Sequence, residues 1–313
     1  MDAVRYREVE ERLWEYFNLQ PTEQMVSLPT TGTDVRVQET GDGPPVLMVH
    51  GGAVNGSSWA PLAAELPQFR CLMVDRPGCG LSPPIGTTLQ TIDELVSFAE
   101  ELVPAILDGL DLERAHVICT SLGGFFGFHG ASAHPERYNR LVGIGSIFGS
   151  PMDGIPFIMR VGTIGPMPKL MARMPANRQV VRSMLRQIGL KDALRAGRIA
   201  AEFEDWFLAN MKHTDGLLNE ATEFPSVINI GGMVPDAIMS PAALGRIVAP
   251  TKLIWGEADP MAGADVAKRF TDQLPDAQLE LWPNTGHAPW IDNPGRAARS
   301  IEEFLGATSR RCR

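Results

Sequence analysis

Short apolar runs alternate with stretches of helical spacing along most of the chain. Buried strands are predicted at PPVLMVH (44–50), CLMVD (71–75), AHVICT (115–120), RLVGIGSI (140–147), TKLIWG (251–256) and AQLELWPN (277–284), with two shorter ones near 25–28 and 35–39. Helical spacing returns from Leu89 to Leu107 and again after Ser121. Strands that are apolar throughout and separated by helices are typical of a parallel sheet covered on both faces.

Two segments depart from this alternation. Residues 3–18 place apolar side chains at helical spacing, which predicts an amphipathic helix within residues 1–20 that lies on the core. Residues 150–245 are largely helical in pattern and hold nine of the 14 methionines. We therefore expect an α/β core formed by residues 21–149 and 246–313, interrupted by a helical insertion at 150–245.

Composition narrows the class of protein. A net charge of −9 argues against a nucleic-acid-binding protein. No apolar run is long enough to span a membrane, and the charged N-terminal stretch lacks a signal-peptide core, so a cytoplasmic protein is expected. The four cysteines (Cys71, Cys79, Cys119 and Cys312) stand singly, which favours reduced thiols and no metal site.

Ser121 follows a strand-like run directly and precedes two glycines, as in TSLGG (120–124). This pattern fits the nucleophile elbow G-x-S-x-G, with Gly123 at the second position after the serine and Cys119 in place of the first glycine. An ordinary turn or helix-capping serine is the alternative. The helix expected after Ser121 would favour a developing anion at its N-terminus.

A serine nucleophile needs a base and an orienting acid. His287, in NTGHAPW, follows the last predicted strand, and Asp259, in WGEADP, lies 28 residues before it. The order serine, acid, histidine is that of an α/β-hydrolase triad. Glu257 and Asp153 are the alternative acids, and His287 could instead be a capping or surface histidine.

The oxyanion of an attacked carbonyl needs two main-chain donors. One is expected at Leu122, directly after the serine, and the other at Gly52 or Ala53 in the HGGAVNG loop. Four apolar residues are candidates for the substrate pocket: Phe148, Phe157, Met159 and Trp206.

Five fragments in order together resemble the α/β-hydrolase superfamily over about residues 25–305. They are VHGG with SSW (49–59), DRPGCGLS (75–82), TSLGG with HPERYNRLV (120–142), WGEADP (255–260) and GHAPW with the following proline (286–294). The resemblance implies a mostly parallel eight-stranded sheet with helices on both faces and a lid, residues 150–245, after the sixth strand. It also implies that Asp75 and Arg76 belong to a structural loop.

Serine at the elbow distinguishes this chain from haloalkane dehalogenases and epoxide hydrolases, which resemble it but carry aspartate there. The expected function is a cofactor-free serine hydrolase that cleaves an ester or related acyl bond of a small, largely apolar substrate with water. Alternatives that use the same pocket are a carbon–carbon bond hydrolase, an aminopeptidase or a lyase. A non-enzymatic small-molecule receptor is a further alternative, and a monomer or homodimer is expected.

Overall fold

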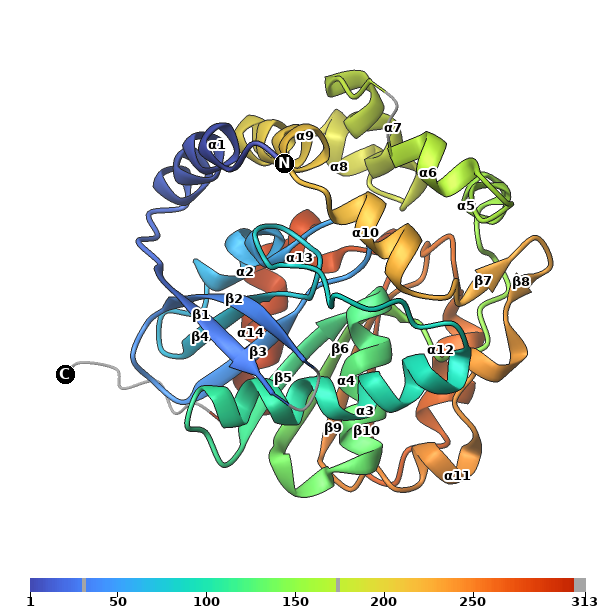
Figure 1. Cartoon of the computed structure of the whole chain (residues 1–313). Coiled ribbons are helices and arrows are strands. Elements are labelled where there is room, and N and C mark those ends of the chain that lie inside the picture. The colour runs from blue at the N-terminus through green and yellow to red at the C-terminus, as the bar shows by residue number, and fades with distance from the viewer. Residues whose placement is uncertain (30–31, 173–174, 307–313) are drawn as a thin grey trace.

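The computed structural model describes residues 1–29, 32–172 and 175–306, and its central feature is an eight-stranded sheet (Figure 1). The strands lie in the order β1-β2-β4-β3-β5-β6-β9-β10. Their bounds are β1 (Thr22–Leu28), β2 (Thr33–Thr40), β3 (Pro45–Val49), β4 (Arg70–Asp75), β5 (Ala115–Thr120), β6 (Tyr138–Ile147), β9 (Thr251–Gly256) and β10 (Ala277–Trp282). Strand β2 pairs antiparallel with β1 and β4, and the remaining pairs are parallel. The predicted mostly parallel sheet is confirmed.

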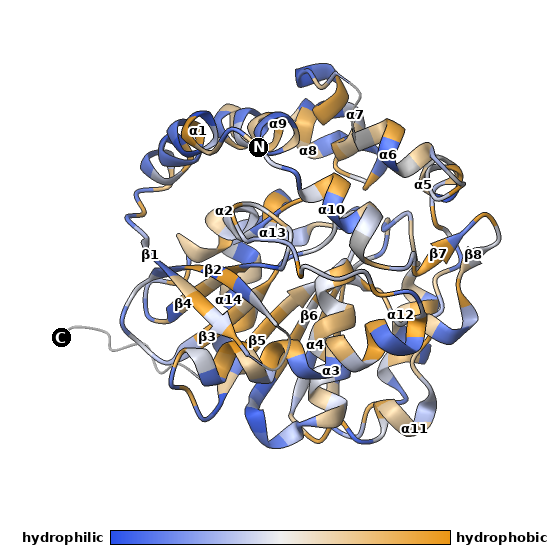
Figure 2. Ribbon diagram, viewed as in Figure 1, coloured by the Kyte–Doolittle hydropathy of each residue, from blue (hydrophilic) through white to orange (hydrophobic). Residues whose placement is uncertain are grey.

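Helices cover the sheet on both faces. One face packs against α3 (Ile92–Gly109), α4 (Ser121–Ala133) and α12 (Ala264–Thr271), and the other against α2 (Ala60–Ala63), α13 (Pro289–Asp292) and α14 (Pro294–Leu305). Successive residues of β5 alternate between the two apolar clusters, with Val117 in one and Ile118 in the other. Because both faces are covered, the central strands are largely apolar, as Figure 2 shows for the middle of the sheet.

An insertion between β6 and β9 lies above one end of the sheet (Figure 1). Its elements are α5 (Phe157–Gly162), α6 (Met167–Ala172), α7 (Arg178–Gln187), α8 (Lys191–Arg195), α9 (Ala201–His213), α10 (Gly216–Glu223), a hairpin of β7 (Ile228–Asn229) and β8 (Gly232–Met233), and α11 (Pro241–Leu244). The Met239 N–H donates to the Gly149 carbonyl (2.9 Å), so the two ends of the insertion meet. Among the helices of the described residues, none is both long and apolar enough to cross a membrane.

The last part of the predicted insertion, residues 241–244, is placed differently from the helices above the sheet. Helix α11 contacts α4, and the Ser132 hydroxyl donates to the Ala243 carbonyl (2.8 Å). The structure thus adds a short hairpin to the helices expected at 150–245 and returns the chain to the core before residue 245.

Helix α1 (Ala3–Tyr16) forms where the N-terminal periodicity predicts it, but it packs along α9 of the insertion (Figure 1). The Tyr6 hydroxyl accepts a hydrogen bond from the Trp206 indole N–H (3.0 Å). The buried Leu13 and Trp14 of α1 belong to the apolar cluster that also contains Val46 and Met48 of β3, so the helix packs against the insertion and shares an apolar cluster with the core. Polar side chains of α1 also reach the core.

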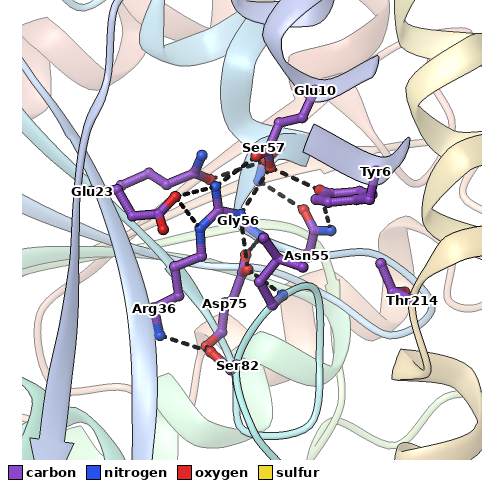
Figure 3. A network of polar contacts seen from close by, with 12 residues as sticks. Tyr6, Glu10, Glu23, Arg36, Asn55, Gly56, Ser57, Asp75, Ser82 and Thr214 are labelled. Carbon is purple, nitrogen blue, oxygen red and sulfur yellow. Dashed lines mark hydrogen bonds and ion pairs between the residues drawn. The ribbon is translucent and has the colours of Figure 1, made fainter. Parts of the chain in front are cut away.

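These polar side chains form a buried network around Arg36 (Figure 3). The Arg36 guanidinium, only 1% exposed, binds Glu10 of α1 (2.6 Å), Glu23 of β1 (2.7 Å) and Asp75 at the end of β4 (3.4 Å). Asp75 also accepts the Gly56 N–H (2.8 Å). Burial raises the pKa of Asp75 to about 6, although the charge of Arg36 opposes the shift. The network ties α1 and the loop after β3 to the sheet.

Candidate active site

Ser121 stands at a sharp strand-to-helix turn. Strand β5 ends at Thr120, α4 begins at Ser121, and Ser121 has φ +51°, a left-handed conformation that costs a non-glycine residue about 1–3 kcal/mol. A Cβ on Gly123 would collide with the main-chain oxygens of Val49 and His50. The glycine at this position is therefore required by close passage of the β3 end, as the elbow pattern predicts.

His287 and Asp259 form a buried pair. The His287 Nδ1 atom lies 2.8 Å from Asp259 Oδ2, and the Asp259 carboxylate also accepts the N–H groups of Met261 (2.9 Å) and Ser146 (3.0 Å). Burial alone would raise the pKa of Asp259, but the charge and hydrogen bond of His287, with these two N–H groups, hold it below its usual value. The carboxylate is thus ionised and oriented toward Nδ1.

The two alternative acids are placed elsewhere. Glu257 and Asp153 are both exposed, whereas Asp259 is 6% exposed. Exposure leaves a carboxylate in water, where it cannot fix the orientation of a buried imidazole. The structure therefore brings Asp259, and not Glu257 or Asp153, to the histidine.

Ser146 is a member of this cluster that sequence patterns did not single out. Its hydroxyl lies 3.0 Å from His287 Nδ1, in addition to its N–H bond to Asp259. The preceding residue, Gly145, has φ +76°, and a Cβ there would collide with the His287 carbonyl. The only sequence signal for Ser146 was the glycine that precedes it at the end of an apolar run. This signal does not indicate that His287 lies beside the serine.

Ser121 and His287 meet the same short segment at the end of β6. Ser121 forms a bridge with Ile147, and its carbonyl accepts the Phe148 N–H (3.1 Å), while His287 contacts Gly145 and Ser146. Within the described residues, no hydrogen bond joins the Ser121 hydroxyl to the imidazole. The three predicted side chains thus converge at the carboxyl-terminal ends of the parallel strands.

The predicted main-chain donors also lie there. A Cβ on Gly51 would be 3.0 Å from the Ser121 Cβ, and one on Gly52 would be 3.8 Å from Leu122 Cδ2. The Ala53 N–H donates to Glu220 Oε2 of α10 (3.0 Å). The Gly52 N–H has no hydrogen-bond partner among the described residues. Of the two donors predicted in this loop, the Ala53 N–H is thus engaged and the Gly52 N–H is not.

Glu220 and Arg76 form a second ion pair beside this loop, which sequence patterns did not reveal. The Arg76 guanidinium pairs with the Glu220 carboxylate and donates to the carbonyls of His50 (3.1 Å) and Gly51 (3.0 Å). Burial, assisted by the charge of Arg76, lowers the pKa of His50 well below its usual value, so this ring is neutral. Glu220 and Arg76 are 144 residues apart, and no spacing rule predicts such a pairing.

The pocket candidates separate into two pairs. Phe148 is buried next to the Ser121 carbonyl, and Met159 packs half-buried against the same apolar cluster. Phe157, in contrast, is 70% exposed on α5. Trp206 is fully buried in the opposite cluster, where its indole N–H requires the Tyr6 hydroxyl. The prediction of Phe157 and Trp206 as pocket residues is corrected accordingly.

The sheet order, the strand-to-helix turn at Ser121 and the buried acid–histidine pair define an α/β-hydrolase. The alpha/beta hydrolase family model matches residues 46–300, and the chain belongs to this family.

Similar sequences of curated function include hydrolases named for 2-hydroxy-6-oxo-dienoate substrates. The chain is 28% identical over 306 residues to the 2-hydroxy-6-oxononadienedioate/2-hydroxy-6-oxononatrienedioate hydrolase of Cupriavidus pinatubonensis, covering 91% of this chain and 96% of that protein. It is 25% identical to the 2-hydroxy-6-oxo-6-phenylhexa-2,4-dienoate hydrolase of Burkholderia cepacia, covering 82% and 86%.

Solved structures of similar fold include an esterase. Naproxen esterase from Bacillus subtilis superimposes with a TM-score of 0.75 at 18% identity, covering 96% of this chain and 97% of that one. At this identity the likeness establishes the fold alone.

Proposed function

We propose that this protein is a serine hydrolase in which Ser121 is the nucleophile, His287 the general base and Asp259 the orienting acid. The observation that carries the proposal is the buried Asp259–His287 pair, which lies at the same end of the sheet as the strained turn at Ser121. Asp259 holds the proton on Nδ1, which leaves Nε2 as the basic nitrogen. Hydrogen bonds between nucleophile and base commonly tighten only when substrate binds.

The proposed reaction proceeds in two halves. The Ser121 Oγ attacks the substrate carbonyl while His287 Nε2 takes the hydroxyl proton, and the oxyanion is stabilised by the N–H groups of Leu122 and Gly52. The carbonyl re-forms as the leaving group departs with the proton from His287. Water then attacks the acyl-enzyme, His287 again takes and returns a proton, and the acid product leaves.

An ester with an apolar acyl group is the substrate class that the surroundings support best. Phe148 is buried beside the Ser121 main chain, and Met159 belongs to the same cluster. Arg76, the cation that contacts the loop before Gly52, is already neutralised by Glu220. A substrate carboxylate at that position would have to displace an internal one. The helices α5–α10 would act as the lid over this pocket.

Carbon–carbon bond hydrolysis is the second candidate, favoured by the curated relatives at 25–28% identity. The same residues serve either reaction, since both cleave a bond next to a carbonyl and consume one water. The purified protein should be assayed with aryl esters of increasing acyl length and with a 2-hydroxy-6-oxo-dienoate. Faster turnover of the dienoate than of every ester would replace the first candidate with the second.

The proposal of a serine nucleophile is tested separately from the substrate. A fluorophosphonate probe should label the wild-type protein and not Ser121→Ala, and both Ser121→Ala and His287→Ala should lose several orders of magnitude in kcat while remaining folded. Near-wild-type turnover by Ser121→Ala would refute it.

A further inference from the structure

Two side chains of the insertion bind the main-chain N–H and carbonyl groups of Ala53, in the loop after β3. The Ala53 N–H donates to Glu220 Oε2 of α10 (3.0 Å), and the Ala53 carbonyl accepts from Asn210 Nδ2 of α9 (3.1 Å). Asn210 is 4% exposed, and the Glu220 side chain is 15% exposed. Both contacts are therefore shielded from water and bridge the insertion to the core.

Ala53 needs such support because of its backbone. Its φ is +63°, in the left-handed region that a residue with a Cβ occupies at a cost of about 1–3 kcal/mol. The neighbouring residue is Gly52, whose N–H has no hydrogen-bond partner among the described residues. The peptide group that carries this N–H joins Gly51 to Gly52 and is separated from Ala53 only by the Gly52 backbone torsions. A change in the Ala53 conformation would therefore shift this peptide group through Gly52.

Asn210 is fixed in the orientation that donates to Ala53. Its Oδ1 accepts from the Asn55 side-chain N–H (2.9 Å), so its Nδ2 must face the Ala53 carbonyl. Asn55 also donates to the Tyr6 hydroxyl (2.7 Å) and accepts the Ser57 N–H (3.0 Å), as Figure 3 shows around Tyr6 and Asn55. The amide is thus held by α1 and by the loop itself.

Glu220 is fixed as well, by its ion pair with Arg76. Arg76 in turn donates to the carbonyls of His50 and Gly51, the two residues that precede Gly52. The main-chain groups on both sides of the Gly52 N–H are therefore held by side chains, and two of those side chains come from the insertion.

From this we infer that Asn210 and Glu220 are positioning residues, which set the oxyanion donor at Gly52 only when α9 and α10 are in place. The insertion is then a part of the catalytic apparatus as well as a cover. The inference rests on the proposed function, because it assumes that the Gly52 N–H stabilises the oxyanion. A donor that is moved by a fraction of its hydrogen-bond length loses transition-state stabilisation while substrate binding changes little.

The test uses Asn210→Ala and Glu220→Ala in the full chain, with Asn219→Ala as the matched control. Asn219 lies on α10 beside Glu220, but its side chain donates to the Gly78 carbonyl (2.8 Å) and not to the loop after β3. Active sites are counted by stoichiometric fluorophosphonate labelling, and kcat is expressed per labelled site. Affinity for an alkyl boronic acid, which forms a tetrahedral anionic adduct, is measured in parallel.

We expect Asn210→Ala and Glu220→Ala to lower kcat per labelled site about 10- to 100-fold with KM changed less than about threefold, and to weaken boronate binding in proportion. The double variant should lose less than the product of the two, because both act on Ala53. Asn219→Ala should keep kcat within about twofold.

Unchanged kcat per labelled site in Asn210→Ala and Glu220→Ala, even with a lower melting temperature, would overturn the inference by reducing both contacts to a structural role. That outcome is distinct from failure of the proposed function. In the latter case Ser121→Ala would stay active and the probe would label another residue or none.

Discussion

Gly127 of α4 makes room for Cys119 of β5: a Cβ at position 127 would lie 2.7 Å from the Cys119 sulfur. Cys119 occupies the elbow position where the pattern expects glycine, and its side chain is fully buried. The sulfur therefore fits because the facing helix lacks a side chain at position 127, nearly two turns into α4. The departure from the elbow pattern is accommodated within the same strand–helix pair.

This relationship predicts that Gly127→Ala destabilises the protein. The added methyl overlaps the sulfur, and overpacking of this kind costs about 1–3 kcal/mol, which exceeds the roughly 1 kcal/mol that alanine gains over glycine in a helix. The free energy of unfolding is measured by urea titration. Cys119→Gly combined with Gly127→Ala should recover most of the loss. Equal stability of Gly127→Ala with and without the second change would show that the sulfur is not the obstacle.

Ser146 predicts a graded effect on catalysis. Ser146→Ala removes the hydroxyl near His287 Nδ1 but keeps the N–H bond to Asp259, so kcat should fall only about two- to fivefold. Asp259→Asn, which changes the hydrogen-bonding of Nδ1 itself, should lower kcat by about 10³- to 10⁴-fold.

The matched control for Ser146 is Ser150→Ala, because the Ser150 hydroxyl is also buried near the end of β6 but donates to the Ile147 carbonyl (2.7 Å). It should leave kcat unchanged. If Ser146→Ala proved as damaging as Asp259→Asn, then the hydroxyl and not the carboxylate would be the principal partner of the imidazole.

Asp75 predicts a specific dependence of stability on pH. Burial raises its pKa from 3.8 to about 6, so between these pH values the unfolded chain binds fewer protons than the folded chain. The free energy of unfolding contributed by this group therefore falls as the pH rises through that window. Relative to wild type, Asp75→Asn should remove a decline of about 2 kcal/mol between pH 4.5 and 6.5.

This slope is measured by urea unfolding at several pH values, with the exposed Asp42→Asn as the control that should leave it unchanged. A wild-type slope in Asp75→Asn would mean that Asp75 is ionised across the window, with Arg36 outweighing burial.

The Tyr6 hydroxyl predicts that α1 contributes to global stability. It accepts from the Trp206 and Asn55 side chains and donates to Glu10 (2.8 Å), so Tyr6→Phe leaves two buried donors without this acceptor. The expected loss is about 1–3 kcal/mol in the free energy of unfolding. Tyr16→Phe, the same change on the same helix at a 53% exposed position, should be neutral. Equal effects of the two changes would contradict a buried role for this hydroxyl.

The sequence predicted the central strands well because β3, β4, β5 and β9 are largely apolar and bounded by turn residues, a pattern typical of buried parallel strands. It also singled out Ser121, Asp259 and His287, since their order and their positions after strands follow from the direction of a parallel sheet. Their catalytic roles stay predictions.

Contacts made by the insertion could not be predicted in the same way. Trp206 illustrates the reason: its hydrophobicity indicates burial but does not reveal that the partner is Tyr6, 200 residues away. Asn210 and Glu220 are ordinary polar residues of amphipathic helices until the helices are placed over the loop. Cys312 and the basic residues beside it lie outside the described residues.

Because Met239 and Gly149 are hydrogen-bonded, the insertion begins and ends at neighbouring points of the core. Such a segment can be exchanged between homologues without a change in the core backbone. Grafting in this protein would nonetheless have to transfer two pieces of chain. The Tyr6 hydroxyl accepts the hydrogen bond of the Trp206 indole. A chimera that received residues 150–239 without residues 1–16 would therefore contain α9 without the acceptor that its indole N–H uses. The N-terminal helix and the insertion would thus be exchanged together or not at all.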